Sequence, residues 1–293
     1  MELNLLNLYQ ITGDNKLKLF DEYNVAAKIT DFAVLLGGTA SDNYILHKKF
    51  NGKGRLGKWW TKTSSNDYNC IFTVNLYGSI SLSNLDNRDN GIRLIVPYSS
   101  ISSLSKTIKN NKSTKEVICG EYPQEIMDEV SSLILESAYE NNKLTETGKK
   151  YITDSIDRSN TKERFNAKEH IEYEHKGKKY IRYISNFSYF NEQLSNGRKI
   201  NEKEKYWLKV EPVKWLVDIE NDIAITEKII VAGIQFNYND YDDNFENTDI
   251  YKYMNIYLVK DIFNNTNIEN KEFKDINNKM KILRKRINNI KNN

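Results

Sequence analysis

The chain has 293 residues, a formal net charge of +3 at pH 7 and two cysteines. Its length allows one large domain or two small ones with a sizeable core, and the small net charge argues against nucleic acid as the main partner. Cys70 and Cys119 form neither a CxxC motif nor a disulfide framework. This cysteine usage argues against a disulfide-stapled secreted domain and favours a reducing, cytoplasmic location.

Neither a secretion signal nor a membrane span is expected. Glu2 and the asparagines that interrupt the first apolar residues are unlike a signal peptide. No run approaches the roughly 18 apolar residues that a membrane helix needs, so we expect no membrane partner. Asn, Lys, Ile and Tyr are abundant and Pro is scarce, a bias typical of an AT-rich bacterial or phage genome.

Short helices are predicted at the start of the chain. The apolar spacing predicts helices over residues 3–11, 14–23 and 30–36, and Gly37-Gly38 ends the last of them. Residues 39–58 are polar and rich in glycine, so we expect a long loop there.

Residues 57–101 contain the clearest strand pattern. β-branched and aromatic residues alternate with polar ones in four runs, WWTKT, CIFTV, SISLS and IRLIVPY. Turn sequences rich in Asn, Asp and Gly separate the runs. The pattern predicts an antiparallel meander that carries polar loops, a common plan for a recognition surface.

The second half of the chain mixes strands and helices. We expect a linker over 106–115, a helix over about 124–142 and irregular structure over 144–165. The helix would place Ile126, Val130, Leu133, Ile134 and Ala138 on one face. A hairpin is predicted around Lys176-Gly177-Lys178, followed by three strand-like runs and a helix that begins at Asn247 or Thr248.

The C-terminal residues 269–291 form a second clear pattern. Eight basic and three acidic side chains surround apolar residues spaced by three and four positions, which predicts an amphipathic helix. Its apolar seam consists of Phe273, Ile276, Met280, Leu283, Ile287 and Ile290. Because so short a helix is marginal alone in water, it must dock on its own domain, on a second copy or on a protein or RNA partner.

Several segments resemble one known family. Trp59-Trp60, the Gly78-Ser79 turn and Gly91-x-Arg93 resemble the closing half of an uncharacterised bacterial domain. That domain belongs to the formylglycine-generating-enzyme-like branch of the C-type lectin fold. The later sequences GEYPQ, PVKWLVD and FENTDIYKYMNIYL resemble its opening half, so the two halves stand in swapped order.

The resemblance implies an α+β, C-type-lectin-like fold with a mixed or antiparallel sheet, flanking helices, a possible circular permutation and an added C-terminal helix. Its implied domain boundaries are a closing half at 1–105, a linker at 106–115, an opening half at 116–266 with an inserted region at 144–206, and the helix at 267–293. Two readings stay open: one permuted domain, or two separate units.

Candidate binding residues lie in the loops of the meander. Tyr offers a large contact area at low entropic cost, and Asn donates and accepts hydrogen bonds. The expected ligand- or partner-binding residues are Trp60, Tyr68, Asn69, Tyr77, Asn84, Asp86, Asn87, Arg88 and Asp89, with help from residues 238–245. Arg93 is expected to be structural.

No metal or cofactor is expected. Asp240, Asp242 and Glu246 would supply oxygen ligands, but the cluster lacks the glycine-bearing loop of an EF-hand. No Walker, GxSxG or dinucleotide-binding motif occurs in the sequence, and we predict no catalytic residue.

The sequence therefore predicts a non-catalytic recognition protein, monomeric or homodimeric, that binds a protein or glycan. We expect no nucleic-acid partner except through the basic C-terminal helix. The genome bias favours a phage or mobile-element protein that acts on a host defence complex, as anti-CRISPR proteins do. Two alternatives stay open: a carboxylate-dependent hydrolase, and a scaffold that oligomerises through the C-terminal helix.

Overall fold

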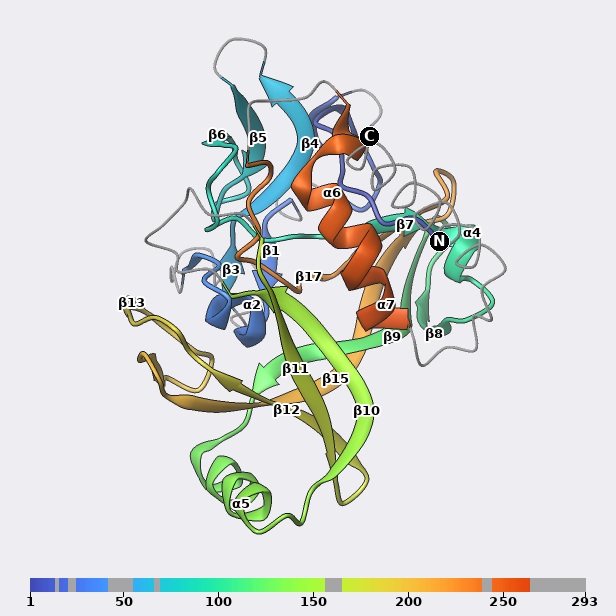
Figure 1. Ribbon diagram of the computed structural model, residues 1–293. Helices are drawn as coiled ribbons and strands as arrows, with labels where there is room; N and C mark the ends of the chain where they lie inside the picture. The colour runs from blue at the N-terminus through green and yellow to red at the C-terminus, as the bar shows by residue number, and fades with distance from the viewer. Residues whose placement is uncertain are drawn as a thin grey trace, which may run out of the picture.

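Strands dominate the protein. The computed structural model describes residues 1–13, 16–20, 25–41, 55–65, 69–155, 165–238 and 244–263, shown in Figure 1. The sheets are antiparallel or mixed, and the helices are few. The longest helix runs from Asp249 to Phe263 in three consecutive segments, α6 (Asp249–Tyr253), the π-helical η2 (Met254–Leu258) and α7 (Val259–Phe263). The predicted start of this helix is confirmed, because the Thr248 side chain caps it.

The largest sheet is built around β15 (Lys205–Asp218). The long strand β9 (Thr114–Ile126) pairs along β15 and also pairs with β8 (Lys106–Asn110). The other neighbours of β15 are β12 (Lys178–Ile184) and β16 (Ile223–Thr226). The sheet is completed by β10 (Thr145–Asp154) and β11 (Ala167–His175), which follow β12, and by β7 (Ile95–Pro97), which pairs with β16.

Three smaller sheets surround the large one. The meander β4 (Trp59–Ser65), β5 (Cys70–Val74) and β6 (Ile80–Asn84) is antiparallel, as predicted. A mixed sheet has the order β17 (Lys228–Ile229), β1 (Ala27–Ile29), β3 (Leu56–Gly57) and β2 (Ala40–Ser41). The third is the pair β13 (Tyr189–Gln193) and β14 (Lys199–Ile200).

Residues from the two predicted halves are interleaved in these sheets. Strand β7 from the early part of the chain pairs with β16 from the late part, and β1 pairs in parallel with β17. An isolated bridge joins Ile92 to Val231. One hydrophobic cluster contains Trp59 and Trp60 together with Trp215 and Phe236. The two parts therefore bury their apolar surface against each other.

The short helices have clear local causes. Helix α2 (Asp31–Leu35) begins at Thr30, whose Oγ1 accepts from the Ala33 amide, and is followed by Gly37 with φ of +91°. Helix α5 (Glu129–Glu140) is capped by Asp128. It packs on the outside of the large sheet through a separate cluster formed by Met127, Leu135, Tyr173, Tyr180 and Trp207. The remaining helical segments are α1 (Tyr9–Thr12), α4 (Tyr98–Ile101) and the 3₁₀ turn η1 (Phe245–Asn247).

The structure differs from the sequence predictions in several segments. Residues 3–6 are extended rather than helical, because Asn4 bridges to Ile95 while Leu3, Leu5 and Leu6 are buried. The expected linker at 106–115 is the hairpin of β8 and β9, and the expected irregular region at 144–165 contains β10. The fourth run of the meander forms β7, which pairs with β16 rather than with β6.

The helix predicted over 124–142 is shorter, and most of its predicted apolar face is wrong. Strand β9 continues to Ile126, so α5 begins only after Asp128. Leu135 and Ala138 face the sheet, whereas Val130, Leu133 and Ile134 are exposed. The helix predicted over 267–293 lies outside the described residues.

Candidate partner-binding surface

The β5–β6 hairpin presents apolar side chains to solvent. Phe72 pairs with Leu82 across the two strands, and their neighbours Ile71 and Thr73 are buried on the other face. Leu82 is 44% exposed and Phe72 is half-buried. Because side chains alternate between the faces of a strand, Phe72 and Leu82 share the outer face of the meander.

The turn between the two strands holds Tyr77 outward. The Asn75 Oδ1 atom accepts hydrogen bonds from the amides of Tyr77 (2.9 Å) and Ser79 (3.1 Å). Gly78 takes φ of +81°, a conformation that glycine adopts without strain. The Tyr77 side chain is 57% exposed. The turn is thus fixed by its own hydrogen bonds while its aromatic ring is free to contact a partner.

A distant segment of the chain lies beside this hairpin. The carbonyl of Leu85, just after β6, accepts hydrogen bonds from the amides of Phe236 (2.8 Å) and Asn237 (3.1 Å). Tyr238 is 36% exposed, and its amide donates to Asp249 at 2.7 Å. Of the region predicted to assist binding, residues 238–245, Tyr238 therefore follows directly on residues that bond to the end of the hairpin.

Two residues of the predicted set are buried and act as supports. Trp60 has no exposed surface, and its ring lies 5.4 Å from the Phe236 ring. Arg88 is 4% exposed, forms an ion pair with Asp154 and donates to Gln235 Oε1 at 2.9 Å. Their expected role as contact residues is wrong in this conformation, because neither reaches the surface.

Arg93 is structural, as expected. It is 2% exposed, lies between the rings of Phe20 and Trp59 at 5.4 Å from each, and donates from Nε to the Thr226 carbonyl at 2.9 Å. Burial lowers the pKa of Arg93 to about 9, and the nearby Glu227 carboxylate opposes that shift.

The other predicted residues differ in their exposure. Asn69, at the start of β5 with φ of +50°, and Asn84, at the end of β6, are exposed. Asp86, Asn87 and Asp89 are half-buried. Tyr68, Asp240, Asp242 and all six seam residues of the C-terminal segment lie outside the described residues.

No metal centre is found within the described ranges. Glu246 is exposed in η1, and nowhere in the described part of the chain do three His, Cys, Asp or Glu side chains gather as metal ligands. Within the same part, no helix is long and apolar enough to cross a membrane.

Phe72 and Leu82 were missed by the sequence analysis. The run SISLS alternates as a strand should, but its apolar Leu82 is exposed while Ser81 and Ser83 bond to Thr73 and Asn90 on the other face. Alternation identifies the two faces of a strand without saying which one is buried. The alternation was visible in the sequence, but only the three-dimensional pairing shows which face of the strand is exposed.

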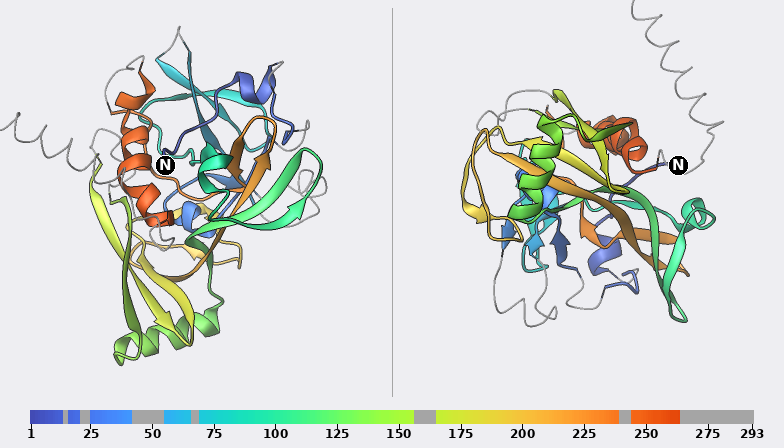
Figure 2. Two further views of the ribbon diagram at one scale, coloured as in Figure 1. Left: turned by 90° about the vertical axis from the view of Figure 1, so that its right-hand side faces the viewer. Right: turned by 90° about the horizontal axis from the view of Figure 1, so that it is seen from below.

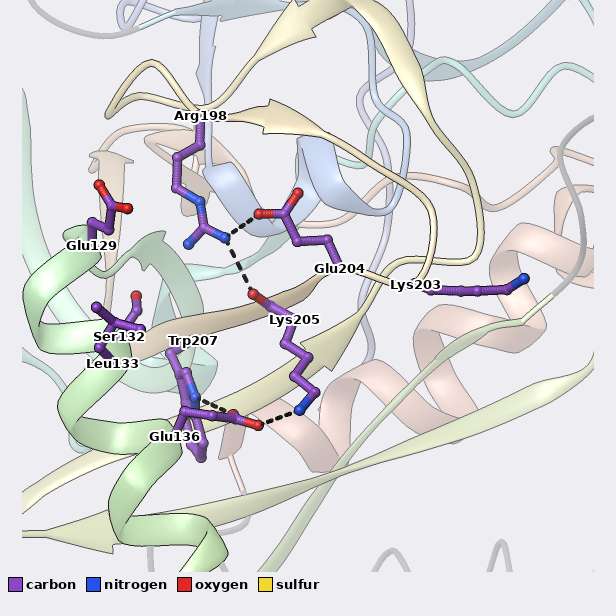
Figure 3. Close-up of a pocket in the computed structure, with 9 residues that line it drawn as sticks. All are labelled: Glu129, Ser132, Leu133, Glu136, Arg198, Lys203, Glu204, Lys205 and Trp207. Carbon is purple, nitrogen blue, oxygen red and sulfur yellow. Dashed lines mark hydrogen bonds and ion pairs between the residues drawn. The ribbon is translucent and has the colours of Figure 1, made fainter.

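A pocket elsewhere bears on the hydrolase alternative (Figure 3). It has a volume of about 580 Å³ and is lined by Glu129, Ser132, Leu133, Glu136, Arg198, Lys203, Glu204, Lys205 and Trp207. Hydrogen bonds from Arg182 above all, and also from Lys205 and Trp207, lower the pKa of Glu136 to about 2. Burial acts to raise the pKa of Glu204, but hydrogen bonds from Arg198, Asn201 and Tyr206 lower it overall. Both carboxylates are held ionised, whereas a general acid needs a raised pKa.

Burial raises the pKa of two carboxyl groups away from this pocket, Glu125, which is ion-paired with Lys228, and Asp261. Asp261 on α7 is 5% exposed, and burial raises its pKa to about 7. Its Oδ2 atom accepts a hydrogen bond from the Ile152 amide at 2.7 Å. The carboxyl group thus fastens α7 to β10 and does not line the described pocket.

Comparisons with known proteins add no relative. No family model matches the chain, and no significant match was found among curated proteins or among solved structures. The lectin-like resemblance therefore stays a prediction.

Proposed function

We propose that this protein is a non-catalytic recognition protein that binds a protein or glycan partner through the outer face of the β5–β6 hairpin and the adjoining residues 236–238. The observation that carries the proposal is the pair of hydrogen bonds from the Phe236 and Asn237 amides to the Leu85 carbonyl, which join the chain just before Tyr238 to the end of the hairpin. The resulting surface combines exposed Tyr77, Leu82 and Asn84.

The chemistry of this surface suits recognition. Exposed tyrosine and leucine supply apolar contact area, and asparagine supplies adaptable hydrogen bonds around it. The support beneath the surface is closely packed, because the Trp59 and Trp60 side chains are completely buried. A surface that is ordered before binding loses less entropy when it captures its partner.

We also propose that the protein is a permuted C-type-lectin-like domain that acts inside a cell. A permuted C-type-lectin-like domain is consistent with early and late strands that pair with each other. Cys70 and Cys119 are not joined in a disulfide, in keeping with a reducing compartment. We therefore propose a cytoplasmic partner, such as a host defence complex met by a phage or mobile-element protein.

Matched substitutions test the proposal. Tyr77→Ala combined with Leu82→Ser should abolish capture of a partner from a lysate of the source organism and binding to a glycan array. Ile108→Ser on β8 is the control, since Ile108 is 52% exposed on a strand outside the proposed surface. Equal loss in both variants, or capture unchanged by the hairpin variant, would contradict the proposal.

A further inference from the structure

The pocket beside α5 has two walls that are tied to the rest of the protein. Helix α5 forms one wall and packs on the large sheet through Leu135. The segment from Arg198 to Lys205 forms the other wall, and just before it Asn196 Nδ2 donates to the Met127 carbonyl at 3.2 Å. The volume of about 580 Å³ falls within the range of small-molecule sites. Both walls are therefore held in place before a ligand binds.

The charges around this pocket balance. It is lined by three carboxylates and three cationic side chains, so its formal charge is zero. The carboxylates belong to Glu129, Glu136 and Glu204, and the cations are Arg198, Lys203 and Lys205. A strongly anionic ligand would be repelled by the first set, and a strongly cationic ligand by the second. The pocket therefore suits a ligand whose own charges balance.

Two of the three carboxylates are already paired within the chain. Glu136 accepts from Lys205 Nζ at 2.7 Å. Glu204 accepts from Arg198 Nη2 at 2.5 Å. The Glu129 carboxylate, on the first turn of α5, is exposed and has no hydrogen bond or ion pair to another residue within the described part of the chain (Figure 3). Glu129 is therefore available to accept hydrogen bonds from a cationic group of a ligand.

Arg198 offers a donor from the other wall. Its Nη2 atom donates to Glu204 and to the Lys205 carbonyl, and its guanidinium carbon lies 4.7 Å from the centre of the Tyr206 ring. These contacts fix the orientation of the guanidinium group. Among the described residues Nη1 has no acceptor, and in Figure 3 it points toward the wall formed by α5. An oriented guanidinium group with an unused donor suits a carboxylate.

An apolar side chain completes the lining. Leu133 is 67% exposed and borders the pocket from α5. We propose that the pocket binds a zwitterionic ligand with an apolar side chain, either a free amino acid such as leucine or a short peptide. The ligand's ammonium group binds Glu129, its carboxylate binds Arg198, and its side chain packs on Leu133.

This site is separate from the proposed recognition surface. The β4–β6 meander and α5 lie at opposite ends of the molecule (Figures 1 and 2). The inference therefore goes beyond the proposed function, and its test does not depend on the partner of the β5–β6 hairpin.

Titration calorimetry and ligand-observed NMR of the full chain test the ligand class with four probes. Leucine and leucyl-leucine carry both charges, whereas N-acetyl-leucine lacks the ammonium group and leucinamide lacks the carboxylate. The better zwitterion should bind at least about tenfold more tightly than either blocked compound, because each blocked compound loses a charge-assisted hydrogen bond. Tighter binding of leucyl-leucine would identify a peptide as the ligand, and tighter binding of leucine a free amino acid.

Matched variants test the position of the site. Glu129→Gln should weaken binding of the zwitterion at least about tenfold, whereas Glu140→Gln, on the same helix but outside the lining, should leave it unchanged. Leu133→Ser should weaken binding severalfold, whereas Val130→Ser, at an equally exposed residue outside the lining, should not. All four side chains are exposed, so each variant should keep the fold, which circular dichroism checks.

Three results would overturn the proposal. The first is that neither leucine nor leucyl-leucine binds at millimolar concentration. The second is that a blocked compound binds as tightly as the zwitterions. The third is that Glu129→Gln and Glu140→Gln change the affinity equally, since the ligand would then bind elsewhere.

Discussion

Arg88 and Asp154 join distant parts of the chain through a buried ion pair. Their side chains are 3% and 4% exposed, and Asp154 also accepts a hydrogen bond from the Asn166 amide at 3.1 Å. Removing one partner of a buried pair leaves an uncompensated charge in the interior. Removing one member of the pair should therefore destabilise the fold more than replacing both members.

The first prediction concerns this pair. Asp154→Ala should lower the free energy of unfolding by about 3–5 kcal/mol, measured by urea denaturation. Arg88→Met with Asp154→Leu should cost less, because no buried charge is left alone. Glu169→Ala is the control: it breaks the half-exposed pair with Lys150 and should cost about 1 kcal/mol or less. Similar losses for Asp154→Ala and Glu169→Ala would contradict the prediction.

The second prediction concerns Asp261 and pH. Burial raises its pKa from 3.8 to about 7, so the folded protein binds this proton more tightly than the unfolded chain does. The group's stabilising contribution is complete below pH 3.8 and is lost as the pH rises towards 7. Asp261→Asn has no carboxyl group to ionise, so the variant does not lose this stability as the pH rises. Its side-chain oxygen can still accept a hydrogen bond from the Ile152 amide.

Denaturation at several pH values checks the effect of Asp261. The stability of Asp261→Asn relative to the wild type should increase from pH 4 to pH 8. Asp222→Asn, at an exposed turn where the carboxylate bonds to Ser99, provides a comparison outside the interior. A stability difference that does not change with pH would show that Asp261 does not titrate as described.

At the scale of single residues, the sequence predicted the exposure of some candidate residues and missed the burial of others. Tyr77, Asn69 and Asn84 are exposed as expected, because turn chemistry places such residues at the surface. Trp60 and Arg88 are buried for reasons invisible in local sequence. Their partners Phe236 and Asp154 come from far along the chain.

At the scale of elements, the contact of β9 with α7 depends on a glycine. Gly120 has φ of +74°, and an added Cβ would meet Ile262 Cγ2 at 2.4 Å and the Ile262 carbonyl oxygen at 2.8 Å. Gly148 in β10 has a similar φ of +81° with no atom within 4 Å of the same position. Alanine at Gly148 therefore tests the free-energy cost of the backbone conformation alone. Alanine at Gly120 adds the cost of close packing.

The third prediction uses this pair of glycines. Gly148→Ala should cost about 1–2 kcal/mol, the penalty for a left-handed residue. Gly120→Ala should cost about 1–3 kcal/mol more, since it also displaces Ile262 and with it α7. Thermal unfolding of both variants measures the difference, and equal losses would show that α7 is not packed tightly against β9.

Elements with strong local signals were predicted well. The β11–β12 hairpin turns at Lys176 and Gly177, both with positive φ, as expected for a two-residue turn. Helix α2 is bounded by Thr30 and Gly37, as its cap sequence indicates. Strands β8 and β10 were missed, because their polar sequences become strands only by pairing with β9 and β11.

At the scale of the whole molecule, the two sequence segments share sheets and a hydrophobic cluster. Early strands β1 and β7 pair with late strands β17 and β16, and the main hydrophobic cluster draws residues from both segments. Sequence alone left one domain and two domains open, because the pairing of β7 with β16 has no local signature. The proposed recognition surface depends on this union, since Leu85 and Phe236 come from different segments.

Native-state hydrogen exchange in increasing denaturant tests that union most directly. If the two segments unfold together, the amides of β7 and β16 should reach the same free energy of opening, equal to that of global unfolding. A separate, lower opening free energy for residues 1–105 would contradict it. That result would show that the early segment detaches as a unit and that the shared surface is not held rigidly.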